Sequence, residues 1–371
     1  MAEQSKRLVS LDVFRGATIA LMILVNTPGS WKYVYGPLRH AAWHGCTPTD
    51  LVFPFFLFIV GVAMWFAFGK YDHSLNKKSA QKVLKRTFLI FLIGLLMNWY
   101  PFWDRPFETL RIMGVFQRIA LAYGLASLLA LTTNKKQQIW SAAGILIGYW
   151  LLMLLFGGDD PFGKELNLVR KIDLFILGEK HLYKGFGLPF DPEGLFNTLP
   201  AVVTVLLGYW AGQFIQETKD RLKVVNELYF YGLVSLAAGV VWGAFFPINK
   251  ALWTSSYVLY TGGWALVVLA FMISLIDLKG YQGWTKPFVV FGTNPLFVYV
   301  LSVLWVKTGY YMIKWNTAAG EKTNLLGWLY AHVFVPIAGS MNGSLLFAVS
   351  HIVVYWLILS ILYKKKIFIK I

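Results

Sequence analysis

A short stretch of the chain, residues 40 to 50, gathers side chains that exchange protons. Its sequence HAAWHGCTPTD places His40, His44 and Asp50 within eleven residues, with Trp43 between the two histidines. An ordinary histidine titrates near neutral pH, so the stretch could form an acid and base centre. A single histidine in a loop is more often simply solvated, but the convergence of several such groups favours the centre.

A metal site is the rival interpretation of the same stretch. His40, His44 and Asp50 offer nitrogen and oxygen ligands, and two histidines four residues apart can share one helical face. Gly45 and Pro48 argue against a regular helix there. We therefore predict no metal. A chain with a single cysteine also excludes an intrachain disulfide framework and any CxxC site.

Two arginines lie where a charge is costly unless it is paired. Arg15 follows Asp12 by three residues near the start of an apolar run, and the pair is either a structural salt bridge or, through Arg15, part of an anion site. Arg118 lies about two turns inside another apolar run. We expect it to face the interior and to pair with Asp50, with Glu108 or with a substrate.

The elements that position these residues are predicted to be transmembrane helices. Hydrophobic residues make up 57% of the chain, against about 45–50% in ordinary globular proteins, and charged residues only 14%, against about 25%. A net charge of +16 would suggest a nucleic-acid partner in a soluble chain. Here we assign the charge to membrane topology and predict a lipid bilayer, not nucleic acid, as the partner.

Ten runs are long and apolar enough to cross a hydrocarbon core about 30 Å thick. They lie near residues 11–27, 51–69, 87–103, 111–132, 139–157, 198–215, 228–246, 256–276, 287–306 and 344–363. An eleventh run, 325–338, is shorter and contains or borders several glycine and proline residues. The sequence predicts an all-α polytopic membrane protein with about ten transmembrane helices, or eleven if 325–338 spans.

The distribution of Lys and Arg predicts the orientation, because short basic loops stay cytoplasmic. With ten spans, the basic clusters at 6–7, 70–86, 135–136, 219–223 and 279–286, the Lys-rich tail and both termini fall on the cytoplasmic side. Eleven spans would place the Lys-rich tail outside. We therefore expect 325–338 to be an interfacial or re-entrant segment on the outer side. Residues 1–371 are predicted to form one transmembrane domain with the site among four outer segments, 28–50, 100–110, 158–197 and 307–343.

Seven sequence blocks, in order across nearly the whole chain, match those of a known family. They are RLVSLDVFRG (7–16), HAAWHGCTPTDLVFPFFLFIVG (40–61), GVFQRIALAY (114–123), FDPEG (190–194), PINKALWTSSYV (247–258), GTNPLFVY (292–299) and YKKKIFIKI (363–371). The chain resembles the heparan-α-glucosaminide N-acetyltransferase family, including bacterial relatives associated with N-acetylglucosamine utilisation, within a broader group of transmembrane acyltransferases.

The resemblance implies transfer of acetyl from cytosolic acetyl-CoA to the amino group of a glucosamine-type sugar on the far side of the membrane. The catalytic histidine of the family's HAxW block maps onto His40, and a partner asparagine at the end of the first core span maps onto Asn26. This chain has His44 where an asparagine is expected, which makes His44 a second candidate base. A small amino sugar or a cell-envelope fragment is as good an acceptor as polymeric heparan.

Each of these residues is given a chemical role. His40 is assigned as the general base, typically worth 10²–10⁴-fold, or as a nucleophile that carries the acetyl group. Asn26 would donate to the acetyl carbonyl and Asp50 would orient the imidazole. The chain carries no P-loop or GxGxxG, so basic side chains must bind acetyl-CoA, and we predict Arg15 and Arg118. The predicted sugar contacts are Trp43, His44, Asp191 and Glu193.

Two alternatives of other kinds remain at this point. An amino-sugar transporter without chemistry would have polar groups inside its spans too, but it would concentrate its site near the bilayer midplane. An acyltransferase acting on cell-envelope glycans would share the chemistry and differ in its acceptor. We expect a multi-pass protein of the bacterial inner membrane, and a homodimer is left open.

Overall fold

The structure, a computed structural model, describes residues 8–102, 106–317 and 320–369. Within these ranges the regular elements are helices and one antiparallel hairpin of β1 (Lys314–Asn316) and β2 (Lys322–Asn324). The helices are α1 (Val9–Asn26), α2 (Val52–Phe68), α3 (Lys77–Trp99), α4 (Val115–Thr132), α5 (Lys135–Phe156), α6 (Leu168–Leu177), α7 (Thr198–Glu217), α8 (Arg221–Gly243), α9 (Ser255–Met272), α10 (Lys286–Thr293), α11 (Pro295–Lys307), α12 (Leu325–Leu329) and α13 (Val335–Lys364).

The helices are those of a polytopic membrane protein. In the described part of the chain, eight helical segments are long and apolar enough to cross a membrane, and nine if the bent pair α10 and α11 forms one span. The sequence predicts about ten, and the difference is α3. This helix is 23 residues long, but Lys82, Lys85 and Arg86 occupy its first half, so only its second half is continuously apolar.

The predicted span 287–306 is not one straight helix. It is divided into α10 and α11, whose axes differ in direction by 82°. Pro295 begins α11 and lacks the backbone N–H that would continue α10. The side chain of Asn294 is bonded to the tail of the chain, donating to the Ile367 carbonyl at 3.1 Å and accepting from the Ile369 N–H at 2.7 Å. The bend is therefore fixed by a contact from a distant part of the sequence.

The segment 325–338 folds back onto the beginning of the helix that follows it. The Tyr330 hydroxyl donates to the Ser340 carbonyl at 2.9 Å, whereas residues ten apart along a straight helix are separated by about 15 Å. Gly339, between them, has a φ of +73°, a conformation that side-chain-bearing residues rarely adopt. The chain therefore reverses at Gly339, which is the shape expected of a re-entrant or interfacial segment.

Close packing of α2 against α7 fixes the position of the residues that begin α2. A Cβ atom on Gly61 of α2 would lie 1.9 Å from the Val205 carbonyl oxygen, and one on Gly208 of α7 would lie 1.9 Å from the Phe58 carbonyl oxygen. Small residues at a helix crossing let two backbones approach in this way. Asp50 lies just before α2, and its backbone carbonyl accepts the Tyr257 hydroxyl of α9 at 2.6 Å.

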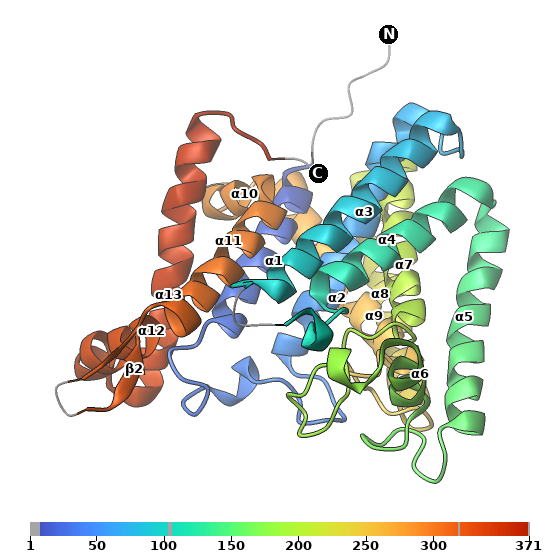
Figure 1. Ribbon diagram of the computed structural model, residues 1–371. Helices are drawn as coiled ribbons and strands as arrows, with labels where there is room; N and C mark the ends of the chain where they lie inside the picture. The colour runs from blue at the N-terminus through green and yellow to red at the C-terminus, as the bar shows by residue number, and fades with distance from the viewer. Residues whose placement is uncertain (1–7, 103–105, 318–319, 370–371) are drawn as a thin grey trace.

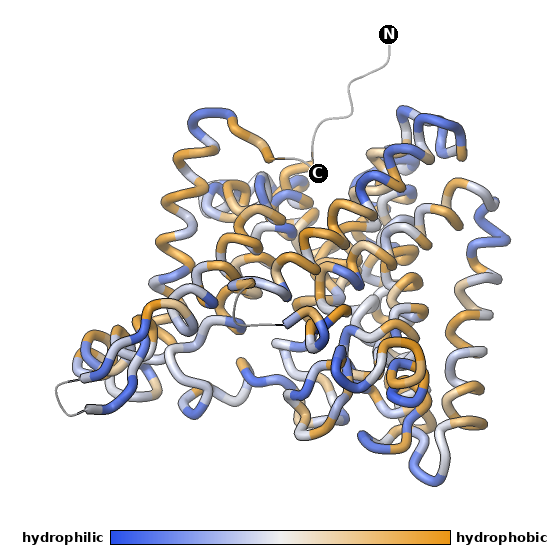
Figure 2. The backbone as a smooth tube through the Cα atoms, viewed as in Figure 1, coloured by the Kyte–Doolittle hydropathy of each residue, from blue (hydrophilic) through white to orange (hydrophobic). Residues whose placement is uncertain are grey.

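The two ends of the helix bundle differ in composition. Figure 1 shows the first turn of α1, the starts of α3 and α5 and the last turn of α13 at one end, and α6, α12 and the hairpin at the other. We call the first the basic end, because it carries Lys77, Lys78, Lys135, Lys136, Lys364 and Lys365, and the second the loop end. Apolar residues dominate between the two ends (Figure 2).

The four segments that were predicted to share one side of the membrane contact one another at the loop end. The Trp43 indole donates to the carbonyl of Phe162 at 2.8 Å and so joins the first segment to the third. The Tyr100 hydroxyl lies 2.7 Å from Thr308 Oγ1 and joins the second to the fourth. These contacts bring the four segments into one layer over the ends of the helices.

Candidate functional site

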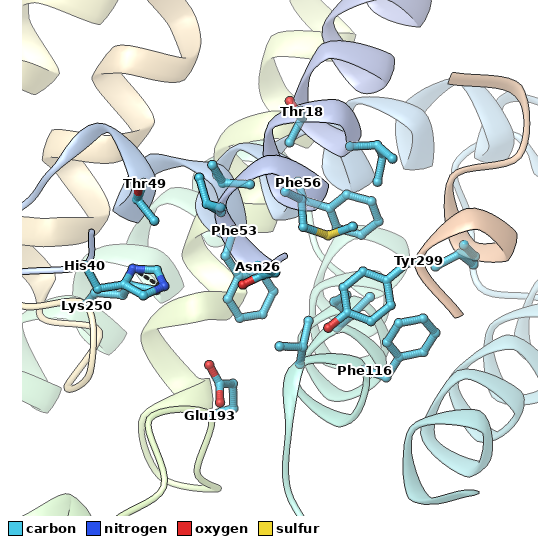
Figure 3. Close-up of a pocket in the computed structure, with 17 residues that line it drawn as sticks. Thr18, Asn26, His40, Thr49, Phe53, Phe56, Phe116, Glu193, Lys250 and Tyr299 are labelled. Atoms are coloured by element: carbon cyan, nitrogen blue, oxygen red, sulfur yellow. Dashed lines mark hydrogen bonds between the residues drawn. The ribbon is translucent and has the colours of Figure 1, made fainter. Parts of the chain in front are cut away.

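A pocket at the loop end opens between α1, α2, α4 and α11. Most of its lining is apolar, and its polar side chains are those of Thr18, Asn26, His40, Thr49, Glu193, Lys250 and Tyr299. In Figure 3, His40 and Lys250 lie together on one side, Asn26 lies near the middle, and Glu193 and Tyr299 lie on other sides. Residues far apart in the sequence thus border one cavity, which we call the loop-end pocket.

His40 and Asp50 form a directly bonded pair at this pocket. Asp50 Oδ1 lies 2.6 Å from His40 Nδ1, and Asp50 Oδ2 accepts the backbone N–H groups of Ala41 and Thr47, each at 3.0 Å. An ionised carboxylate only accepts hydrogen bonds, so Nδ1 of His40 donates to Asp50, and Nε2 is the ring nitrogen that can accept a proton. The pair therefore presents a base, held in one tautomer by Asp50.

Lys250 is the third member of this cluster, and the sequence reasoning missed it. Its Nζ lies 3.5 Å from Asp50 Oδ1 and 3.1 and 3.4 Å from the two ring nitrogens of His40. Burial lowers the pKa of Lys250, and the negative charge of Asp50 opposes that effect. One signal could have found it: Lys and Arg are biased toward cytoplasmic loops, and Lys250 is the one basic residue in the short connection 247–255, which the ten-span topology places outside.

A second missed cation, Arg111, fixes Glu193 at the pocket wall. Arg111 donates to both oxygens of Asp191, at 2.8 and 2.6 Å, and to Glu193 Oε2 at 2.6 Å. Burial alone would lower the pKa of Arg111, but the two acids more than offset it and raise that pKa. Because the side chain of Asp191 is fully buried, it requires a counter-charge, and the guanidinium of Arg111 provides it.

Replacing Arg111 by methionine is expected to destabilise the fold by about 3–5 kcal/mol, because it leaves the Asp191 carboxylate buried without a cation. Chemical denaturation of the purified protein in detergent, followed by intrinsic tryptophan fluorescence, measures the change. The matched control is Arg170→Met, since Arg170 donates to the backbone carbonyls of Pro189 and Glu165. Equal unfolding of the two variants would contradict the assigned role of Arg111.

Three predicted sugar contacts do not line the loop-end pocket. The Trp43 ring packs against Phe190 with centroids 5.3 Å apart, and His44 Nδ1 lies 3.3 Å from Asn249 Nδ2. Burial lowers the pKa of His44, partly offset by Asp160. Asp191 is engaged by Arg111. Among the predicted sugar contacts, Glu193 alone lines the pocket, because Trp43 and His44 face the loops that cover it.

The two carboxylates predicted as partners of Arg118 are wrong. Its Nη2 donates to Asn197 Oδ1 and, at 3.5 Å, to the Gly194 carbonyl, and its guanidinium lies 4.8 Å from the Trp253 ring centroid. The predicted carboxylates, Asp50 and Glu108, are not these partners, because the chain just before α7 passes over Arg118 instead. The side chain is fully buried and does not line the loop-end pocket.

A second pocket opens at the basic end, and we call it the basic-end pocket. Its cationic lining residues are Arg15, Lys82 and Arg86. Arg15 bonds Asp12 at 3.4 Å, the predicted salt bridge, and the Gly292 carbonyl at 3.3 Å. Arg86 Nε is buried and makes no hydrogen bond within the described ranges. Three cations therefore converge at one opening, and one of them keeps a donor unused.

The two pockets share lining side chains inside the helix bundle. Phe56 of α2, Ile119 of α4 and Leu296 of α11 line both. A molecule that enters at the basic end and reaches His40 and Asn26 would therefore pass these three apolar side chains.

Comparison with known proteins identifies the family. Residues 7–241 match the family model described as heparan-alpha-glucosaminide N-acetyltransferase, catalytic. The chain belongs to this family. It is 30% identical over 352 residues to the heparan-alpha-glucosaminide N-acetyltransferase of Homo sapiens, covering 79% of this chain and 52% of the relative. It is 28% identical over 427 residues to that of Mus musculus, covering 99% of this chain and 61% of the relative.

The resemblance inferred from the sequence blocks is thus confirmed. The chain spans about half to three fifths of the length of these curated relatives. The part matched to the N-acetyltransferase family model contains Asn26, His40 and Asp50, whereas Lys250 lies beyond it. The cluster at the loop-end pocket therefore combines residues inside and outside the matched region.

The rival metal interpretation would require His40, His44 and Asp50 to lie close together. His40 contacts Asp50, whereas His44 turns toward Asn249. Over the ranges that the structure describes, no three His, Cys, Asp or Glu side chains are arranged to hold a metal ion. The geometry brings His40 and Asp50 together with a lysine instead of a second histidine.

Proposed function

We propose that this protein transfers acetyl from acetyl-CoA to the amino group of a glucosamine-type sugar across a membrane. One observation carries the proposal: a pocket with three cations shares three lining side chains with a pocket lined by Asn26 and by His40, which is bonded to Asp50. The cationic pocket fits the phosphates of CoA, and the other fits acyl transfer. Membership of the N-acetyltransferase family supports both halves.

The proposed topology has both termini and the basic end in the cytoplasm and the loop end outside. The Lys-rich starts of α3 and α5 and the Lys-rich end of α13 lie at one end of the bundle, as the inside bias of such residues requires. In this assignment α3 is a tenth span and 325–338 is re-entrant from outside. The chain forms one transmembrane acyltransferase domain, which we place in a bacterial inner membrane.

Arg15, Lys82 and Arg86 are proposed to bind the phosphates of acetyl-CoA. Buried donors near an anion form charge-assisted bonds, which are stronger than neutral ones, and Arg86 Nε is buried without a partner in the described residues. Arg118 lines neither the loop-end pocket nor the basic-end pocket, so we assign it to holding the chain before α7 through Asn197 and Gly194.

Replacing Arg86 by glutamine is expected to raise the KM for acetyl-CoA about tenfold, since a hydrogen bond to a charged group is worth about 1.5–3 kcal/mol and 1.4 kcal/mol is a factor of ten. We expect kcat to change by less than about twofold, because Arg86 is at the opposite pocket from His40. Initial rates at varied acetyl-CoA measure both constants. The control is Lys78→Gln, at an exposed position at the start of α3. If Arg86→Gln has the same KM for acetyl-CoA as the wild type, Arg86 is not part of the CoA site.

The proposed chemistry uses His40, Asn26 and Asp50. The nitrogen of the sugar amine attacks the acetyl carbonyl carbon, and His40 Nε2 accepts a proton from that amine. The Asn26 side-chain amide donates to the oxyanion that forms, and Asp50 stabilises the charged imidazole through Nδ1. The carbon–nitrogen bond forms, the carbon–sulfur bond breaks, and His40 returns the proton to the departing thiolate. An acetyl-histidine intermediate at His40 is the two-step alternative.

The decisive experiment is an assay of the purified protein with radiolabelled acetyl-CoA and a panel of amino sugars, with N-acetylglucosamine as the acceptor that lacks a free amine. Label transferred to glucosamine or to a glucosamine-terminated glycan, and absent from N-acetylglucosamine, supports the proposal and ranks the acceptors. Binding of amino sugars with no labelled product would overturn it in favour of a transporter.

A further inference from the structure

Lys250 stands beside the proposed base, and its backbone is fixed there by the segment that carries His40. The Gly45 N–H donates to the Ile248 carbonyl at 2.7 Å, and Gly45 pairs with Asn249 in an isolated bridge. The Asn249 side chain accepts the Leu252 N–H at 2.8 Å and so closes a tight turn around Lys250. Lys250 is therefore held in place before any substrate binds.

The charges around Lys250 assign its role. The side chain of Asp50 is 1% exposed, and a buried carboxylate requires a counter-charge. His40 cannot be that counter-charge while it acts as a base, because a base must be neutral. In the described part of the chain, the ion pairs of Asp50 are those with His40 and Lys250. Lys250 is thus the cation that balances Asp50 when His40 is neutral.

We propose that Lys250 is a positioning residue that neutralises Asp50 and thereby keeps His40 in its unprotonated, base form. This inference rests on the proposed function. Without Lys250, the negative charge of Asp50 would favour the imidazolium form of His40, which cannot accept a proton. The ammonium also lies within 3.4 Å of His40 Nε2, where a second positive charge on the ring would be repelled.

The other titratable groups near Lys250 are compatible with this role. Glu193 and Cys46 face Lys250 together with Asp50. Burial raises the pKa of the Cys46 thiol to about 12, with Asp50 adding to the effect, so the thiol stays neutral across the working range. Glu193 is held by Arg111 at 2.6 Å. Although burial lowers the pKa of Lys250, Asp50 and Glu193 both oppose that shift.

The test is the pH dependence of kcat/KM in Lys250→Met, a variant of similar length without the charge. We expect the acidic limb of the profile to move up by about one to three pH units, because a cation within hydrogen-bonding distance of His40 has been removed. The acceptor amine titrates identically with both enzymes, so the difference belongs to the protein. We expect Lys250→Arg, which keeps the charge, to retain the wild-type limb within about half a unit.

Controls separate this role from a purely structural one. Lys164→Met removes a lysine that lies over the Trp43 ring at the same end of the molecule, and its limb should not move. If Lys250→Met does not fold, Lys250→Gln provides the same comparison. The inference is overturned if the acidic limb of the kcat/KM profile does not move in a folded, active variant that lacks the charge. It is also overturned if the limb moves equally in Lys250→Arg. Absence of transfer by the wild-type protein would instead overturn the proposed function.

Discussion

Replacing His40 by alanine is expected to lower kcat/KM for acetyl transfer by about 10²–10⁴-fold, the usual contribution of a general base. The loss follows from geometry, because His40 presents Nε2 to the pocket that Asn26 also lines, with Nδ1 fixed 2.6 Å from Asp50. Steady-state rates with labelled acetyl-CoA measure the effect. Binding of acetyl-CoA should persist, since the three cations are at the other pocket.

The matched control for this experiment is His44→Ala. His44 belongs to the same stretch but lies against Asn249 and outside the lining of the loop-end pocket, so its loss should change the rate only a few-fold. A fully active His40→Ala, or an equally inactive His44→Ala, would show that the base is misassigned. Labelled acetyl trapped on the wild type without acceptor, and lost in His40→Ala, would favour the two-step route.

Replacing Asp50 by asparagine is expected to reduce kcat by about 10²–10⁴-fold with a smaller effect on folding. In serine proteases the corresponding change to the carboxylate that orients the histidine costs about 10⁴. The asparagine oxygen can still accept the N–H groups of Ala41 and Thr47, but its NH₂ then faces His40. That contact makes Nδ1 an acceptor and moves the proton to Nε2, so Nε2 can no longer accept a proton from the sugar amine.

Rates and unfolding should be measured on the same preparations of Asp50→Asn, so that a loss of folded protein is not counted as a loss of chemistry. Asp160→Asn, an exposed carboxylate at the loop end, is the control. Because His40 and Asp50 act as a unit, the double variant should be no slower than His40→Ala alone. Additive losses would mean that Asp50 acts independently of His40.

Much of the fold follows from the sequence because the length and hydrophobicity of each apolar run indicate a membrane-spanning helix without reference to other segments. The predicted runs correspond to α1, α2, α4, α5, α7, α8, α9 and α13, each an independent match to the thickness of a membrane. The discrepancies have local or distant causes. α3 carries five basic residues in its first half, and the 82° bend between α10 and α11 is fixed by Asn294 bonding to the tail.

The candidate site divides in the same way. His40 and Asp50 lie ten residues apart, so their contact is nearly local and could be predicted from the stretch 40–50. The partners of the other charges were not predictable. Arg111 binds Asp191, 80 residues away, and Lys250 reaches His40, 210 residues away. No spacing rule relates such positions.

The sequence by itself therefore determined the membrane class, the family and the acid–base stretch, because hydrophobic length and short-range hydrogen bonding act within a segment. Only the tertiary structure decided which cation lies against Asp50, which residue holds Glu193 and which side chains line both pockets. The physical reason is that the energy of a buried charge depends on the polar and charged groups within a few ångströms of it. Here those groups belong to loops that are far apart in the sequence and that helix packing brings together.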